Sequence, residues 1–199
     1  MQEIKVHIFS CGKLLDVPEL ESVETIQDVV IVHPDVHDDS RGRFLETYRR
    51  SWFPLGREMV QASRSDKQAN SLVGLHYHLH QADYWYVVKG IARIVLHDLR
   101  VGSPTEGSTL LVDTDETDDK GIFIPPGVAH GFAALSDMTL VYLVDGYYNP
   151  ADELGVAFDD PSIGAVWGVD EPTVSPRDRS NPRKEDIPSH LLPRYPLRA

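Results

Sequence analysis

The sequence predicts a mainly β protein, built as a barrel or a sandwich. Short runs rich in β-branched and aromatic residues recur along the chain, and turn-forming residues separate them. Helical signals are weak: the best covers 46–53, where Pro54 and Gly56 would end a helix early. Many short strands at such spacing are typical of barrels and two-sheet folds. The expected strands are 29–32, 60–61, 72–78, 84–89, 91–98, 110–112, 122–124 and 140–144.

The clearest pair of strands is 84–89 and 91–98, which Gly90 separates. Glycine permits the positive φ that tight connections often need, so we expect an antiparallel hairpin. Apolar residues occupy both faces of 91–98, which predicts a strand covered on both sides. The acidic segment 113–120 is expected to be a solvated hairpin loop.

The chain has 199 residues, of which 41% are hydrophobic and 25% charged. This length and composition predict one globular domain with extensions. We place an N-terminal extension at 1–27, the barrel at 28–170 and an extended arm at 171–199. The arm contains six of the 14 prolines and little apolar periodicity, so we expect it to pack over the barrel or a partner.

Charge and composition also limit the partners. The formal net charge of −12 argues against a groove that tracks nucleic-acid phosphates. No apolar run approaches the length of a membrane span, and charged residues interrupt the N-terminus, so we expect a cytoplasmic protein without a membrane partner. The single cysteine, Cys11, excludes an internal disulfide and suits a reducing compartment.

The most specific motif is a set of histidines with one acid. His76 and His78 are two residues apart on an expected strand, so they point to the same face. Asp83 begins the next strand, and His130 follows a Pro-x-Gly turn. This spacing matches the cupin pattern of His-x-His, four residues, an acid, six residues and Gly, followed by Pro-x-Gly-x-x-His. Imidazoles with a carboxylate suit Fe, Mn, Ni, Zn or Co. His76 alone is equally a candidate general base, so both interpretations stay open.

Several further motifs occur in one fixed order over roughly residues 28–180. They are Asp39–Glu46, Gly74–Tyr77, Asp98–Arg100, Ser103–Thr105, Ile124–Gly127, Ala129–Phe132, Leu135–Asp137, Tyr147–Pro150, Asp159–Pro161 and Ser175–Asp178. In this order they resemble the dTDP-4-dehydrorhamnose 3,5-epimerase family, in the cupin superfamily.

The resemblance implies a cupin barrel, usually a homodimer, that acts without a cofactor on a small-molecule substrate, a dTDP-linked 4-keto-6-deoxyhexose. His76 matches the general base that removes a proton beside the C4 ketone, and Asp178 matches the carboxylate that orients it. Tyr142 and Tyr148 match two family tyrosines, and we favour Tyr142 as the acid on the opposite face. Positions that match nucleotide contacts, partly across the dimer interface, are Arg41, Phe44, Glu46 and Gln61.

Three positions depart from the family. Val73 replaces an arginine, Asp83 replaces the lysine that stabilises the enolate, and His78 replaces a glutamine. A carboxylate repels a developing enolate, so Asp83 cannot do the work of the lysine. The last two changes both move the site toward a metal-binding cupin, in which a divalent ion would act as the electrophile.

Three hypotheses follow. The first, which we favour, is a nucleotide-sugar epimerase or isomerase that uses His76, Asp178 and a tyrosine. The second is a metal-dependent cupin enzyme whose Fe, Mn, Ni, Co or Zn ion is held by His76, His78, Asp83 and His130. The third is a non-catalytic nucleotide-sugar binding protein on this scaffold.

Overall fold

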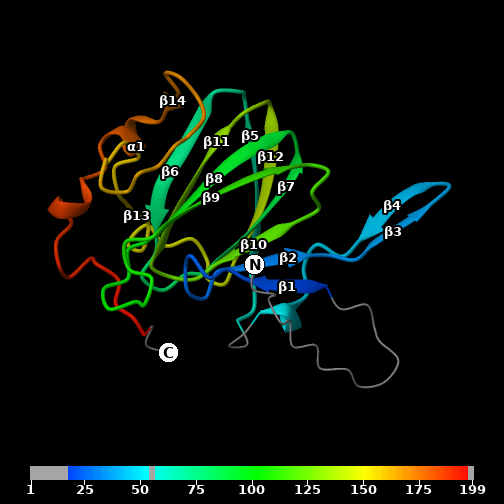
Figure 1. Cartoon of the computed structure of the whole chain (residues 1–199), viewed down its shortest axis with the longest axis horizontal. Helices are drawn as coiled ribbons and strands as arrows, with labels where there is room; N and C mark the ends of the chain where they lie inside the picture. Colours follow the sequence, from blue (N-terminus) through cyan, green and yellow to red (C-terminus); the bar gives the residue numbers. More distant parts are fainter. Residues whose placement is uncertain (1–17, 54–56, 197–199) are drawn as a thin grey trace, which may run out of the picture.

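The computed structural model describes residues 18–53 and 57–196, and these form two antiparallel sheets that face each other (Figure 1). The first sheet has the order β1-β2-β10-β7-β12-β5. Its strands are β1 (Glu19–Ser22), β2 (Val30–His33), β10 (Gly121–Ile124), β7 (Asp83–Lys89), β12 (Met138–Val144) and β5 (Gln61–Lys67).

The second sheet has the order β13-β6-β11-β8-β9, and β14 adds a parallel pairing to β6. Its strands are β13 (Leu154–Gly155), β6 (Ser71–Tyr77), β11 (Val128–Ala134), β8 (Ile91–Asp98), β9 (Thr109–Asp115) and β14 (Thr173–Val174). The short elements outside the sheets are the β3 (Val36–Asp39) and β4 (Gly42–Leu45) hairpin, η1 (Arg50–Trp52), α1 (Pro176–Arg179) and η3 (Lys184–Asp186). The mainly β prediction is therefore confirmed.

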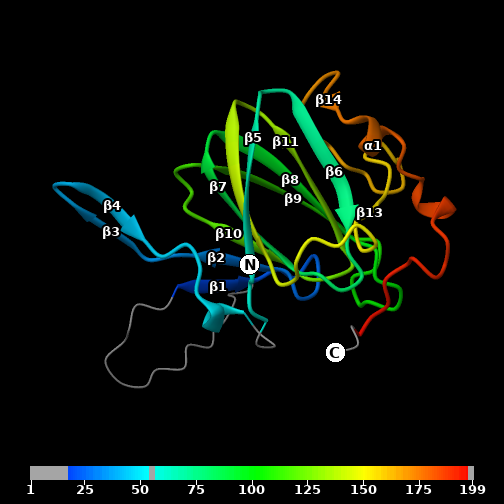
Figure 2. The ribbon, with the colours of Figure 1, turned by 180° about the vertical axis from the view of Figure 1, so that it is seen from behind.

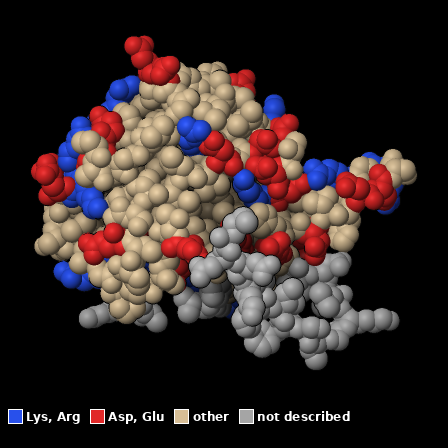
Figure 3. Space-filling model, viewed as in Figure 1, with Lys and Arg blue, Asp and Glu red and all other residues tan. Residues whose placement is uncertain are grey.

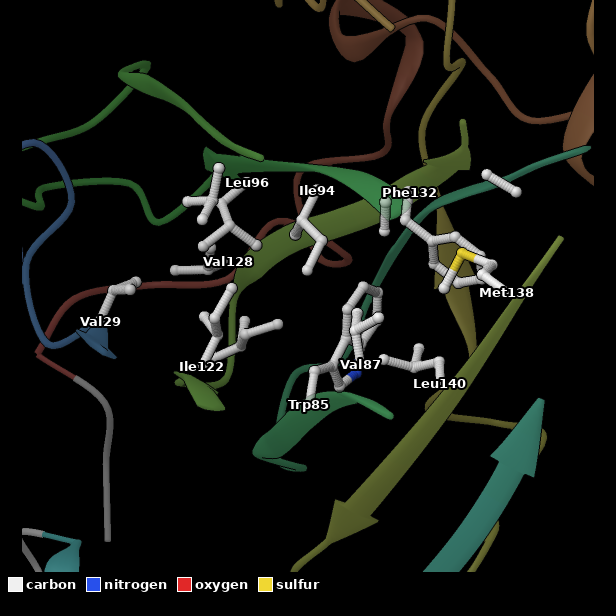
Figure 4. Packing of buried hydrophobic residues seen from close by; sticks show 14 of the residues in the cluster. Val29, Trp85, Val87, Ile94, Leu96, Ile122, Val128, Phe132, Met138 and Leu140 are labelled. Atoms are coloured by element: carbon white, nitrogen blue, oxygen red, sulfur yellow. The ribbon is translucent and has the colours of Figure 1, made fainter. Parts of the chain in front are cut away.

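The main core lies between the two sheets (Figure 4). Because side chains alternate along a strand, each sheet sends every second residue into this space. Trp85 of β7 and Leu140 of β12 meet Ile94 of β8 and Phe132 of β11 there. Burial of such side chains contributes about 1.5–3 kcal/mol each and holds the sheets together.

A second cluster covers the outer face of the second sheet. Val95 of β8 points into this cluster, whereas its neighbours Ile94 and Leu96 point into the main core. Chain from the C-terminal third, including Trp167 and Ile187, packs onto this face, and Figure 2 shows it beside β6. Strand 91–98 is thus covered on both sides, as its sequence predicts.

Some elements differ from the expectations. The segment 46–53 contains only the three-residue η1 and no α-helix. Strand β5 runs over seven residues, Gln61–Lys67, instead of two, and only every second residue is exposed. The β3–β4 hairpin was not expected and projects from the barrel (Figure 1).

The domain limits at 27/28 and 170/171 stay a prediction, although β1 already pairs with β2. Cys11 lies outside the described residues. Acidic and basic side chains are interspersed over the face in Figure 3, and both signs occur on the projecting hairpin. No helix within 18–53 and 57–196 is both long and apolar enough to cross a membrane.

A buried ion pair joins the end of β8 to the loop before β9. Arg100 and Asp98 are both fully buried, and the Arg100 Nε donates to Asp98 Oδ1 over 2.8 Å. The hydroxyls of Ser103 and Thr105 each donate to Asp98 Oδ2 over 2.7 Å. Arg100 also donates to the carbonyl oxygen of Gln27. The motifs Asp98–Arg100 and Ser103–Thr105 therefore supply the hydrogen-bond partners of one buried carboxylate, that of Asp98.

This network predicts a loss of stability in acid. Burial alone would raise the pKa of Asp98, but hydrogen bonds from Arg100, Ser103 and Thr105 outweigh it and lower that pKa. A carboxyl whose pKa is lower in the folded than in the unfolded protein stabilises the fold at any pH above the unfolded pKa, which is about 3.9 for aspartate. That stabilisation is lost as the pH falls through the folded-state pKa. We expect the unfolding free energy to fall more steeply below about pH 4 for the wild type than for D98N. Equal slopes in urea titrations of the two proteins would contradict this assignment.

Candidate active site

A histidine and an aspartate form a hydrogen-bonded pair at the second sheet. His76 lies near the end of β6, and its Nε2 is 2.6 Å from Asp178 Oδ1. The other carboxylate oxygen of Asp178 accepts from the backbone N–H of Gly74 over 3.3 Å. Asp178 is 3% exposed, so water competes little for this carboxylate. We call His76 and Asp178 the dyad.

The local sequence explains why Asp178 reaches β6. Ser175 caps α1 by accepting the N–H of Asp178 over 3.1 Å, and Pro176 occupies the first turn, where its missing N–H costs nothing. The preceding strand β14 runs parallel to β6, with Val174 opposite Leu72. Figures 1 and 2 show β14 and α1 beside β6. The arm thus delivers a carboxylate to the barrel wall.

The dyad determines which nitrogen of His76 can act as a base. A carboxylate only accepts hydrogen bonds, so Nε2 of His76 carries the proton that it donates to Asp178. The free lone pair of neutral His76 therefore lies on Nδ1. Burial alone would raise the pKa of Asp178, but the hydrogen bond and charge of His76 outweigh it and lower that pKa. Asp178 accordingly stays ionised and can stabilise a protonated His76.

Three further residues bring possible metal ligands together. The ligand atoms of His78, Asp83 and His130 all lie within 4.8 Å of one another, and each residue is 4% exposed. Asp83 Oδ1 is 3.7 Å from His78 Nε2, and Asp83 Oδ2 is 3.8 Å from His130 Nε2. We call these three residues the triad. Burial lowers the pKa of His130 to about 4, so this imidazole is neutral near pH 7.

Hydrogen bonds orient both imidazoles of the triad. His130 Nδ1 donates to the carbonyl oxygen of Val128 over 2.9 Å, and His78 Nδ1 donates to that of Asp152 over 2.8 Å. Backbone carbonyls only accept, so in the neutral form of each imidazole the lone pair is on Nε2, the nitrogen that faces Asp83. Trp85 Nε1 donates to Asp83 Oδ2 over 3.1 Å.

The turn between β6 and β7 is held by one carboxylate. Asp152 accepts the backbone N–H groups of Leu79, His80 and Gln81. The Gln81 side-chain nitrogen lies 3.2 Å from His78 Nε2. Sequence reasoning missed Asp152 and Gln81, because neither belongs to a recognisable motif.

Three of the four residues expected to bind a metal lie together in the triad, and metal binding itself stays a prediction. His76 is not in this group, whose ligand atoms all lie within 4.8 Å of one another, and its Nε2 is hydrogen-bonded to Asp178. His76 nevertheless lies directly opposite His130 in the β6–β11 pairing. The dyad and the triad are therefore neighbours in one site.

The two candidate tyrosines have different surroundings. Tyr142 of β12 pairs with Trp85 of β7, packs against the main core and is half-buried. Asp83 lies two residues before Trp85 and so faces the same side of the sheet. Tyr148 is 67% exposed and follows β12 in a loop. Of the two, Tyr142 faces the interior that holds the triad.

The four positions matched to nucleotide contacts are spread over the chain. Arg41 and Phe44 lie on the projecting hairpin, where Phe44 is 67% exposed and Arg41 pairs with Asp39. Glu46 follows this hairpin and pairs with Arg49. Gln61 begins β5 and accepts the backbone N–H of Tyr148. One chain does not bring the hairpin residues to its own dyad (Figure 1).

Val73 packs against the main core, and its replacement of a family arginine stays a prediction. It lies opposite Phe132 across β6 and β11. An apolar side chain therefore occupies the inner wall near the dyad, and no cation is supplied from this position.

Comparison with known proteins places this chain in a family. The model of the dTDP-4-dehydrorhamnose 3,5-epimerase family matches residues 24–186. An enzyme of that name from Mycobacterium tuberculosis is 36% identical over 176 residues, covering 82% of this chain and 87% of its own length. Another, from Neisseria gonorrhoeae, is 37% identical over 160 residues and covers 77% of this chain, which spans only 49% of that relative.

Solved structures agree with this match. The dTDP-6-deoxy-D-glucose-3,5-epimerase of Legionella pneumophila, solved with dTDP-4-keto-L-rhamnose, has a TM-score of 0.84 and 30% identity. The match covers 90% of this chain and 99% of that one, which supports the predicted cupin barrel. This chain belongs to the dTDP-4-dehydrorhamnose 3,5-epimerase family.

Proposed function

We propose that this protein is an epimerase or isomerase of a dTDP-linked 4-keto-6-deoxyhexose, with His76 as the general base. The observation that carries the proposal is the 2.6 Å hydrogen bond between His76 Nε2 and Asp178 Oδ1. It leaves Nδ1 free to accept a proton and holds a carboxylate where positive charge develops. The names and ligands of the relatives indicate the class of substrate.

The proposed reaction moves one proton at a time. Nδ1 of His76 takes the proton from the carbon beside the C4 ketone, and the electron pair of the broken C–H bond becomes an enolate. Asp178 remains ionised and pairs with the imidazolium that forms. A proton from the Tyr142 hydroxyl then returns to the same carbon on the opposite face. The configuration inverts, and solvent restores both side chains to their starting protonation states.

The projecting hairpin supports a homodimer. Phe44 is exposed, and the β3–β4 hairpin that carries Arg41 and Phe44 projects from the barrel (Figure 1), where a second copy could contact it. We therefore propose that Arg41 and Phe44 complete the partner's nucleotide subsite, with Glu46 and Gln61 as further contacts. The cytoplasmic location stays a prediction.

Conversion of the sugar tests the proposed function. The protein is incubated with a dTDP-4-keto-6-deoxyhexose, and proton NMR follows the couplings of the ring hydrogens beside the ketone. New couplings that report an inverted centre are the expected result. A sugar that binds tightly but keeps its configuration would instead favour the non-catalytic binding protein.

Tyr142→Phe should separate the two proton transfers. Removal of the hydroxyl deletes the acid but leaves His76 and Asp178 in place, so the substrate proton should still exchange with solvent. Formation of the epimer should fall by roughly 10²–10⁴-fold, as is usual for the loss of a general acid. Mass spectrometry in D₂O measures exchange, and NMR measures the epimer.

Tyr148→Phe is the matched control, because its side chain is exposed. It should keep both exchange and epimer formation. If Tyr148→Phe instead lost the epimer while Tyr142→Phe kept it, the roles of the two tyrosines would be exchanged.

A further inference from the structure

The triad of His78, Asp83 and His130 is not used by the proposed proton transfers. Its ligand atoms are buried, converge on one point and lie beside the dyad. We propose that these three residues bind a divalent transition-metal ion. Metal binding stands on the triad alone, whereas any role of the metal in the reaction rests on the proposed function.

The spacing of the triad is close to what a metal requires. Two ligands about 2.1 Å from an ion are roughly 3.0–3.4 Å apart in tetrahedral or octahedral geometry. The observed separations are 3.7 Å for Asp83 and His78 and 3.8 Å for Asp83 and His130. These two distances run to different oxygens of Asp83, and the three ligand atoms all lie within 4.8 Å of one another, so binding of an ion requires the side chains to move closer together.

The hydrogen bonds around the triad favour a cation. Metal-binding histidines usually donate their other ring N–H to a carbonyl or carboxylate, which holds the ligand nitrogen in place. His78 and His130 both donate Nδ1–H to backbone carbonyls, and both direct Nε2 toward Asp83. A buried carboxylate is costly without a positive partner. Asp83 receives hydrogen bonds only from the neutral side chains of Gln81 and Trp85 among the described residues.

Gln81 marks the point at which the ligands converge. Its amide nitrogen is 3.2 Å from His78 Nε2 and 3.0 Å from Asp83 Oδ1, so one N–H-bearing group contacts two of the three ligands. A bound cation would repel that N–H group. Rotation of the amide by about 180° exchanges the nitrogen for Oε1, and we expect this oxygen to become a fourth ligand.

The ligand set indicates the kind of metal. Two imidazoles and one carboxylate suit Fe²⁺, Mn²⁺, Co²⁺, Ni²⁺ or Zn²⁺, whereas Mg²⁺ and Ca²⁺ prefer oxygen ligands. A divalent ion here would supply the electrophile for a ketone oxygen that the family's lysine supplies elsewhere. Asp83, which is unsuited to an enolate by itself, would then act as a metal ligand.

Metal titration tests the proposal without any substrate. The full chain is produced without a polyhistidine tag, stripped with a chelator and titrated with Co²⁺, whose visible absorption reports coordination by nitrogen and oxygen. We expect saturation at about one Co²⁺ per chain. Asp83→Asn should weaken binding by at least the roughly 100-fold that loss of an outer partner can cost. Gln81→Ala should weaken it by about 10–100-fold.

Two variants serve as controls. His80 is the adjacent exposed histidine, and His80→Ala should bind Co²⁺ as the wild type does. His76→Gln should also retain Co²⁺, because His76 is outside the triad. Circular dichroism establishes that each variant is folded, and Asp83→Asn keeps the size of the side chain for this reason.

The outcomes separate this site from the proposed function. Absence of saturable Co²⁺ binding, or unchanged binding by Asp83→Asn, would overturn the metal site. Co²⁺ binding without conversion of the keto sugar would overturn the function and leave the metal site standing. Conversion of the keto sugar by a protein that binds no Co²⁺ would overturn the metal site and leave the proposed function standing.

Discussion

His76→Gln is expected to lower kcat for the keto sugar by roughly 10²–10⁴-fold, the usual contribution of a general base. The glutamine amide can still donate to Asp178, so the buried carboxylate keeps a partner. The amide has no basic nitrogen, because its lone pair is delocalised into the carbonyl. Proton abstraction is therefore lost while binding of the dTDP group is retained. Steady-state kinetics and a separate titration with dTDP measure the two effects.

His80→Gln is the matched control for this substitution. His80 lies four residues from His76, is exposed and is outside both the dyad and the triad. Its kcat should stay within a factor of two or so of the wild type. Full turnover by His76→Gln would show that His76 is not the general base. Asp178 would then have no role in orienting and stabilising that base.

Arg100→Met is expected to lower the free energy of unfolding by about 3–5 kcal/mol, the usual result of breaking a buried ion pair from one side. Arg100 and Asp98 are both fully buried, and Arg100 makes two side-chain hydrogen bonds to that carboxylate. Methionine fills much of the same volume but leaves the charge of Asp98 without its cation. Urea unfolding at pH 7 measures the change.

The partly exposed pair of Arg93 and Asp113 provides a comparison. Arg93 Nε lies 2.7 Å from Asp113 Oδ1, but the Asp113 side chain is 56% exposed. Solvent screens such a pair, so Arg93→Met should cost about 0–1 kcal/mol. Similar losses of unfolding free energy for Arg93→Met and Arg100→Met would show that burial does not determine how much an ion pair contributes to stability.

The strands that could be predicted from sequence are those with apolar residues on a buried face. Strand β8 was expected because both of its faces are apolar, and both clusters indeed contact it. Strand β5 was nearly missed because Gln61–Lys67 is largely polar and lies at the edge of its sheet. The β3–β4 hairpin is similarly exposed, so its sequence lacks the regular apolar positions that indicate a strand packed on a core.

The site was only partly accessible from sequence. His76 and Asp178 are 102 positions apart, and only the family resemblance indicated that they meet. Three of the four residues of the metal motif, His78, Asp83 and His130, lie close together, whereas His76 is not in that group and is hydrogen-bonded to Asp178. Asp152 was not predicted, since its role depends on how the loop after β12 returns to the β6–β7 turn.

Deuterium incorporation tests the central claim most directly, namely that His76 removes a proton beside the C4 ketone. Wild type and His76→Gln are each incubated in D₂O with a dTDP-4-keto-6-deoxyhexose, and mass spectrometry counts the carbon-bound deuterons. The account predicts at least one substrate-dependent deuteron beside the ketone with the wild type and none above background with His76→Gln. Equal incorporation by both proteins, or none by a wild type that binds the sugar, would contradict it.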